Sequence, residues 1–300
     1  MYRSLNAELL EKFGTKVYKL ALDGGFTCPN RDGTLGTRGC IFCLGGSGDF
    51  AEKPGESVTE QIERAKARVE KKNPGGKYIA YFQSYTNTYG PLEKLESLFS
   101  EAIAHPDVVA LSVGTRPDCL PDETVALLAR LNERKPVWVE LGLQTVHEKT
   151  AEYIRRGYPL SVYDDAVSRL KAAGLCVVVH MIIGLPGETP EMIYETAEHI
   201  GRSGADGIKL QLLHVLKGTD LEHDWRAGKF EVLSMEKYIE ILEGCIRHLP
   251  PEMTVHRLTG DGDKRSLLAP LWSADKKRVL NEINAAFRRD NVMQGELYEV

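Results

Sequence analysis

The sequence has no long apolar run, which argues against a membrane protein. Its longest apolar stretch, residues 175–185, is interrupted by His180, whereas a membrane-spanning helix needs about 20 apolar residues. The N-terminal residues follow an amphipathic pattern and contain no apolar core of a signal peptide. We therefore expect no association with a membrane and a cytoplasmic location.

Cysteine and net charge are also scarce. Six cysteines among 300 residues are too few for a disulfide scaffold and indicate a reducing cytosol. The formal net charge of −5 does not indicate a general nucleic-acid binder. Residues 256–289 differ from the rest, because Lys and Arg outnumber Asp and Glu there. That segment is compatible with contacts to phosphates, whose affinity would fall with salt.

Three of the cysteines, by contrast, are concentrated in one segment. Cys28, Cys40 and Cys43 lie within residues 27–46, among glycines and turn formers that indicate a loop. Three thiolates are one ligand short of a closed zinc site or of an ordinary iron–sulfur cluster. A [4Fe–4S] cluster held by three cysteines leaves one iron open to a substrate or cofactor. A zinc site and unrelated thiols stay open as alternatives.

Short apolar segments alternate with helical patterns along most of the chain, which is typical of a parallel sheet. Six such units do not close a barrel of eight strands. We therefore predict an α/β fold, a partial (βα)6 TIM-like barrel. Residues 1–250 would form the barrel with an N-terminal helix, and residues 251–300 a C-terminal β/α extension packed on it. The predicted strands cover residues 17–25, 77–85, 108–118, 136–145, 175–189 and 204–215.

Polar residues lie at or near the ends of these predicted strands. Gln144 ends the fourth strand, Arg156 follows it twelve residues later, and His180 lies inside the fifth. Barrel enzymes take their catalytic residues from the C-terminal strand ends, so we expect this face to carry the site and the cysteine loop. Each residue also has an ordinary alternative: a hydrogen-bonded strand end for Gln144, surface charge for Arg156 and a core histidine for His180.

Several motifs occur together that are shared with one known superfamily. They are TRPD (115–118), GLQT (142–145), RRGY (155–158) and HMIIGLPGET (180–189). In these motifs the chain resembles the radical S-adenosylmethionine superfamily, close to the catalytic subunit of elongator and the oxygen-independent coproporphyrinogen oxidases. The best-known members have a CxxxCxxC spacing, whereas eleven residues separate the first two cysteines here. Over nearly the whole chain, the closest resemblance is to the YhcC/YtqA-like family, in the phrases CPNRDGT, RGCIFC, FQSYTNTYG, LHVLKGT and RLTGDG.

The resemblance implies a [4Fe–4S] cluster and S-adenosyl-L-methionine as cofactors. Cys28, Cys40 and Cys43 would ligate three irons, and the methionine part of S-adenosylmethionine would chelate the fourth. Reductive cleavage would then give a 5′-deoxyadenosyl radical that abstracts hydrogen from the substrate. His180 and Tyr85 are candidates for a catalytic role. The residues implied at the cofactor are Gln83 and Ser84 at the methionine amine, Arg156 at its carboxylate, Gln144 and His180 at the ribose, and Ile182 at the adenine.

The resemblance also implies a substrate and partners. Elongator-type relatives act on the wobble uridine of tRNA, so we expect modification of the C5 side chain of that base, from carboxymethylaminomethyl to aminomethyl. Flavodoxin or ferredoxin would donate electrons. Tyr85, Tyr89, Trp272 and His256 are candidates to contact the base. A radical enzyme acting on a small molecule such as a porphyrin, and a non-catalytic metal-binding or redox protein, stay as alternatives.

Overall fold

The protein is built on one curled parallel sheet, seen in a computed structural model that describes residues 1–45, 51, 57–260, 262 and 264–299. Gly46, Asp261 and Asp263, which fall in segments discussed above, lie outside the described residues. The 7-stranded sheet has the order β1-β2-β3-β4-β5-β6-β8, and every pair is parallel. Its strands are β1 (Val17–Leu22), β2 (Lys77–Phe82), β3 (Val108–Thr115), β4 (Val137–Gln144), β5 (Cys176–Ile183), β6 (Gly207–Leu212) and β8 (Thr254–Arg257). The predicted α/β partial barrel is confirmed.

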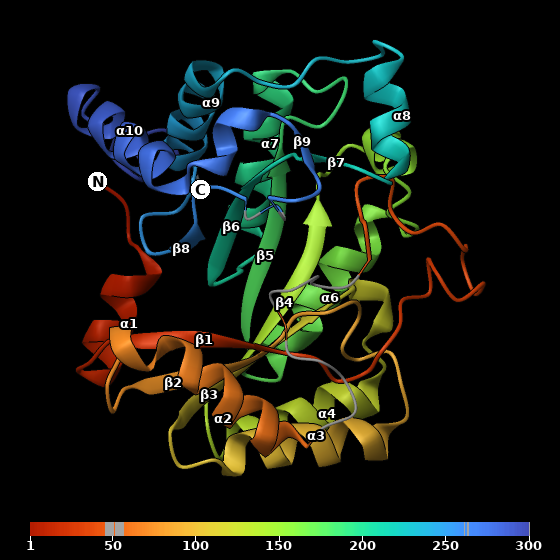
Figure 1. Cartoon of the computed structure of the whole chain (residues 1–300), viewed down its shortest axis with the longest axis vertical. Helices are drawn as coiled ribbons and strands as arrows, with labels where there is room; N and C mark the ends of the chain where they lie inside the picture. Colours follow the sequence, from red (N-terminus) through yellow and green to blue (C-terminus); the bar gives the residue numbers. More distant parts are fainter. Residues whose placement is uncertain (46–50, 52–56, 261, 263, 300) are drawn as a thin grey trace.

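Most helices lie between successive strands on the outside of the curve (Figure 1), while one helix precedes the first strand and one follows the last. They are α1 (Leu5–Phe13), α2 (Val58–Val69), α3 (Leu92–Ala104), α4 (Asp122–Asn132), α5 (Glu148–Tyr153), α6 (Leu160–Ala172), α7 (Pro190–Arg202), α8 (Asp220–Arg226), α9 (Met235–Arg247) and α10 (Lys276–Arg289). Ser57 caps α2, and Glu60 bonds back to the backbone of Ser57, so the helix starts with a complete capping box. Thr189 caps α7 through its side chain. Capping residues next to each helix in the sequence therefore determine where these two helices begin.

Alternation along each strand separates a packed outer face from an inner face. In β4, Val139 and Leu141 join the main hydrophobic core, whereas Glu140 and Gln144 line an interior cavity. Successive side chains of a strand point to opposite faces, and the helices cover only the outer one. A polar residue in an otherwise apolar strand therefore marks the inner face of the barrel.

Helix α1 closes the N-terminal end of the barrel. Its Leu9 is buried in a cluster with Ile79, Ala110 and Trp138, which lie near the starts of β2, β3 and β4. The residue before α1, Ser4, forms a β-bridge to β8. This apolar plug leaves the C-terminal strand ends as the face on which a site can form.

Most predicted elements are present at nearly the predicted positions. The six predicted strands correspond to β1 to β6, and the C-terminal segment supplies β8, which extends the sheet beside β6. Helix α8 and the antiparallel pair β7 (Val215–Leu216) and β9 (Leu267–Ala269) were not predicted, because they are too short to show a periodic pattern. The domain boundary at residue 250 stays a prediction. Within the described part of the chain, no helix combines the length and apolarity that crossing a bilayer requires.

The plug formed by α1 predicts unequal effects at two adjacent leucines. Leu9 is 4% exposed and Leu10 is 52% exposed. We expect Leu9→Ala to lower the free energy of unfolding by about 2–5 kcal/mol through the cavity it leaves. Leu10→Ala is the matched control and should stay within about 0.5 kcal/mol of the wild type. Urea denaturation measures both, and equal effects would contradict the assigned packing of α1.

Candidate active site

A cavity of about 440 Å³ lies at the C-terminal ends of the strands. The loop that follows β1 forms one part of its wall, and inward residues of β2 to β6 and β8 form the rest. Cys28, Cys40 and Cys43 are all among the lining residues. The cavity has the size of a small-molecule site and lies on the face that carries the active sites of barrel enzymes.

The loop is attached to the barrel between its second and third cysteines. The Ile41 N–H donates to the carbonyl of Ile154 (3.2 Å), and the Ile41 carbonyl accepts from the N–H of Leu221 (2.9 Å). The three side chains also share a small buried apolar cluster. The backbone between Cys40 and Cys43 is therefore held between the end of α5 and the start of α8.

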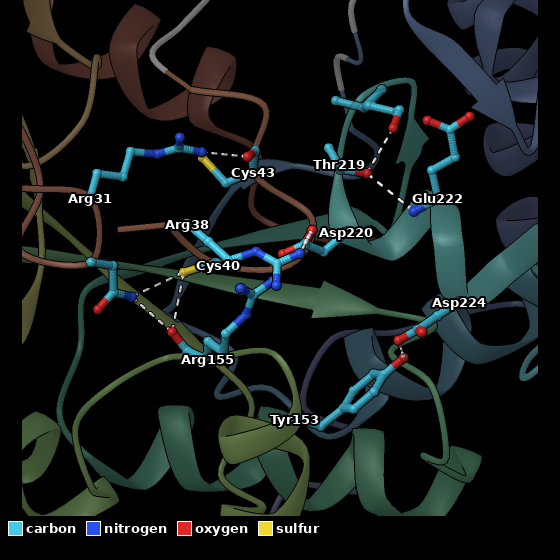
Figure 2. A network of polar contacts seen from close by, with 12 residues as sticks. Arg31, Arg38, Cys40, Cys43, Tyr153, Arg155, Thr219, Asp220, Glu222 and Asp224 are labelled. Carbon is cyan, nitrogen blue, oxygen red and sulfur yellow. Dashed lines mark hydrogen bonds and ion pairs between the residues drawn. The ribbon is translucent and has the colours of Figure 1, made fainter. Parts of the chain in front are cut away.

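An ion-pair cluster strengthens this attachment (Figure 2). Asp220, the first residue of α8, accepts from Arg38 of the loop and from Arg155 after α5. Figure 2 shows the two guanidinium groups meeting at the Asp220 carboxylate next to Cys40. The Arg155–Asp220 pair is partly buried and is therefore less screened by solvent than a surface pair. The Arg38 side chain is exposed. Helix α8 thus serves as an anchor for the cysteine loop.

Two polar side chains of the loop hold the cysteine residues themselves. The Asn30 amide donates to the Arg155 carbonyl (2.8 Å) and approaches the Cys40 Sγ at 3.5 Å. The Arg31 guanidinium donates to the Cys43 carbonyl. The positions of the second and third cysteines thus depend on side-chain contacts as well as on the turns of the loop.

The thiol set fits a [4Fe–4S] cluster. The three loop cysteines are free of disulfides. Burial and then the charge of Cys43 raise the pKa of Cys40 to about 11, so adjacent thiolates need cations to balance them. Among the described residues, no three His, Cys, Asp or Glu side chains converge as ligands of one ion. Three thiols that line one cavity suit a cluster, in which each cysteine ligates a different iron.

Most of the other residues predicted at the cofactor or as catalytic candidates line the same cavity. They are Gln83, Tyr85, Gln144, Arg156, His180 and Ile182. Gln144 has a left-handed φ of 71°, a strained conformation that concentrates at ligand sites. The Gln144 Oε1 is buried without a hydrogen-bond partner. Because such an atom is costly when unpaired, Gln144 fits a site that a polar cofactor completes. The Oγ of Ser84 is also buried and unpaired, but Ser84 is not among the residues that line the cavity. The assigned roles stay predictions.

Arg156 is bound firmly to the protein. It donates to the carbonyls of Thr145 (2.6 Å) and Tyr158 (2.9 Å) and lies 3.3 Å from the Glu148 carboxylate. These bonds fix the guanidinium at the cavity wall and engage all three of its nitrogens, which limits how many donors remain for a ligand. Its predicted contact with the methionine carboxylate stays a prediction. Arg116 also lines the cavity and pairs with Asp118 through two bonds.

The four candidates for contact with a base are dispersed. Tyr85 lines the cavity and is 40% exposed. Tyr89 instead bonds to Thr34 (2.9 Å). Trp272 donates to the Leu233 carbonyl (3.0 Å), and His256 packs edge-on against Trp138. Among the four, Tyr85 alone is a lining residue of this cavity.

A buried charge network, which the sequence predictions missed, lies deeper in the barrel. Glu140 Oε1 accepts from Lys19 Nζ and Ser112 Oγ, both at 2.6 Å. Glu140 Oε2 accepts from His180 Nε2 (2.7 Å) and from Lys209 Nζ. Charged residues inside the apolar segments VWVEL and GIKLQL were the signal for it, because buried charges are rare unless paired. His180 is thus a partner of Glu140.

Burial controls the protonation of this network. Burial would raise the pKa of Glu140, but Lys19 and Lys209 outweigh it and hold that pKa well below its usual value. Burial lowers the pKa of His180 to about 4. Burial also lowers the pKa of Lys209 to about 7, although Glu140 opposes the shift. At neutral pH, Glu140 is therefore ionised and His180 is neutral.

Comparison with known sequences agrees with this site. The profile of the Radical SAM superfamily matches residues 33–200, and that of the Radical_SAM C-terminal domain matches residues 205–289. The chain therefore belongs to the radical SAM superfamily, whose enzymes use a [4Fe–4S] cluster and S-adenosylmethionine. YtqA of Bacillus subtilis (strain 168) is 46% identical over 299 residues, covering 99% of this chain and 93% of that protein. YhcC of Escherichia coli (strain K12) is 38% identical over 291 residues, covering 97% and 93%. The predicted family resemblance is confirmed.

Solved structures show the same fold. Elp3 of the archaeon Methanocaldococcus infernus superposes with a TM-score of 0.71 at 18% identity. The match covers 93% of this chain and 64% of the Elp3 chain. Streptococcus suis SuiB bound to S-adenosylmethionine gives a TM-score of 0.54 at 14% identity, covering 85% and 54%. This chain thus spans part of each of these longer proteins.

The anchor at α8 predicts that one carboxylate supports the cluster. We expect Asp220→Asn to weaken the loop attachment by about 1–2 kcal/mol, because two arginines lose their ionic partner. The reconstituted variant should then retain severalfold less iron per chain after gel filtration. The control is Arg226→Gln, which breaks an exposed ion pair on the same helix without touching the loop. Equal iron retention in all three proteins would contradict the anchoring role.

The neutral His180 predicts how stability depends on pH. Its folded pKa of about 4 lies below the ordinary value of about 6.5, so the unfolded chain binds more protons in between. The free energy of unfolding should therefore fall by up to about 3 kcal/mol from this group as pH drops through that window. His180→Gln keeps an N–H donor for Glu140 and does not titrate. Urea denaturation between these two pH values should show a smaller loss of unfolding free energy in the variant than in the wild type. Parallel pH dependence of the two proteins would contradict the lowered pKa of His180.

Proposed function

We propose that this radical SAM enzyme acts on tRNA and converts the C5 side chain of the wobble uridine from carboxymethylaminomethyl to aminomethyl. The supporting observation is similarity to a protein named for this nucleotide and to an elongator subunit. The tRNA uridine(34) acetyltransferase of Methanocaldococcus jannaschii is 29% identical over 156 residues, covering 51% of this chain and 28% of that protein. Elongator complex protein 3 of Schizosaccharomyces pombe is 24% identical over 264 residues, covering 74% and 48%.

The cavity suits a base presented from outside. Enzymes that react with a base take it out of its stack and hold it in a pocket, and aromatic side chains support such bases. Tyr85 offers an exposed ring at the cavity wall. The exposed cations of α10, Lys277, Arg278, Arg288 and Arg289, supply phosphate contacts that do not depend on sequence.

In this proposal the residues of the chain bind the cofactors and the substrate, orient them, and exclude water from the cavity. The cluster and S-adenosylmethionine, when bound, supply the deoxyadenosyl radical that removes a hydrogen atom from the substrate. Cys28, Cys40 and Cys43 hold the cluster, and Gln144 completes its hydrogen bonds with polar groups of the cofactor. Flavodoxin or ferredoxin provides the electrons.

Cofactor, reaction and substrate class are tested together by one assay. The protein is reconstituted anaerobically with iron and sulfide, then given reductant and S-adenosylmethionine. We expect 5′-deoxyadenosine to form and to increase on adding bulk tRNA from a strain that lacks this protein. The triple variant Cys28→Ala, Cys40→Ala, Cys43→Ala should form none. tRNA from the parent strain, which contains the protein, already carries the converted wobble uridine. It should therefore stimulate the reaction less.

The same assay distinguishes the alternatives. Cleavage that depends on the cysteines but ignores tRNA would contradict the tRNA proposal and favour a small-molecule substrate. Zinc in place of iron, with no cleavage, would favour a non-catalytic metal protein. Mass spectrometry of the tRNA digests then identifies the side chain gained or lost at the wobble uridine.

A further inference from the structure

Deep in the cavity lies a lysine to which the proposed function assigns no role. Lys209 is the third residue of β6, one inward position deeper than Gln211, and it lines the cavity although its side chain is only 4% exposed. Its ammonium group donates to Glu140 and to the Tyr81 hydroxyl (3.1 Å). An ammonium group has three N–H donors, and the described residues provide no acceptor for the third.

Glu140 has no capacity left for a ligand. A carboxylate offers about four lone-pair positions, and Lys19, Ser112, His180 and Lys209 occupy them. A group that enters from the cavity therefore meets a donor on Lys209 and no acceptor on Glu140. The network favours an incoming acceptor.

The charges of this region are unbalanced toward the positive. Among the described residues of the network, Lys19 faces the single carboxylate of Glu140, and His180 is neutral at pH 7. Lys209 adds a second positive charge when it is protonated, and its pKa of about 7 leaves that protonation open to a nearby anion. Surplus buried charge is unfavourable unless a counter-charge joins it. An anion bound here would supply that counter-charge.

We propose that Lys209 binds a carboxylate of the substrate at the base of the cavity, and that Glu140 and Tyr81 position its ammonium group. The inference rests on the proposed function for the identity of that carboxylate, which is the end of the carboxymethylaminomethyl side chain. Two residues of a strand span about 6–7 Å, so Lys209 lies about that much deeper than Gln211. A base near Tyr85 with its C5 side chain directed inward would bring the carboxylate to this lysine.

The test compares two RNA ligands that differ in one charge. A short anticodon stem-loop RNA carries 5-carboxymethylaminomethyluridine at the wobble position, and its partner carries the neutral carboxamide. We expect the wild-type protein to bind the carboxylate RNA about tenfold more tightly, as a charge-assisted hydrogen bond gives. Lys209→Met should remove this preference, and Lys209→Arg should restore part of it.

Lys19→Met is the matched control. It also removes one ammonium group from Glu140, but Lys19 is not among the residues that line the cavity. It should therefore keep the preference for the carboxylate RNA. Equal loss in Lys19→Met and Lys209→Met would show that the network acts through folding alone and would overturn the assignment. If neither variant folds, the comparison of the two RNAs with the wild-type protein remains a test. Equal binding of both would overturn the carboxylate site.

The outcomes separate this inference from the proposed function. Tight, equal binding of both RNAs by the wild type would overturn the carboxylate site and leave the tRNA proposal standing. Binding of neither RNA would contradict the tRNA proposal, and the site is then tested with benzoate and benzamide. A rise in the melting temperature with benzoate alone, absent in Lys209→Met, would support the site. No difference between benzoate and benzamide would overturn it.

Discussion

One buried carboxylate connects most of the barrel. Glu140 of β4 accepts hydrogen bonds from Lys19 of β1, Ser112 of β3, His180 of β5 and Lys209 of β6. A buried charge is strongly unfavourable unless paired and hydrogen-bonded, so these five strands must keep their registers for Glu140 to remain ionised. Apolar packing of the outer face tolerates substitutions that conserve volume. The inner network tolerates few, because each lost donor leaves an unpaired charge.

This network separates two layers of the barrel interior, an apolar layer at the N-terminal end and the layer that holds the site. Below it, Leu9 of α1 packs with Trp138 and its apolar neighbours and keeps water from the N-terminal end. Above it lie the unpaired Oε1 of Gln144 and the cysteine loop. The low dielectric constant of the apolar layer strengthens the charges above it. Positive charge in the network around Glu140 therefore acts on a molecule bound in the cavity more strongly than a cation at the protein surface would.

The sequence was sufficient for those features that depend on local pattern. The βα alternation predicted β1 to β6, the Ser57 and Glu60 pair predicted the start of α2, and the cysteine spacing with the family motifs predicted a site loop after β1. The network around Glu140 was missed, because its members are charged residues in different strands and their contact depends on the curvature of the sheet. The α8 anchor was missed for a similar reason. Asp220 and Arg38 are 182 positions apart, and nothing local connects them.

The distance in sequence between the cysteines and their anchors bears on the order of assembly. The three cysteines are close neighbours in the chain, yet the loop is held by Ile154, Arg155 and residues of α8. Contacts of such separation form late, because the entropy of closing a long loop opposes them until the intervening structure is folded. The thiols are therefore arranged for a cluster only after strands β2 to β6 have joined the sheet. We therefore expect cluster insertion into this protein to follow barrel folding, in contrast to zinc fingers, whose metal drives the folding of the domain.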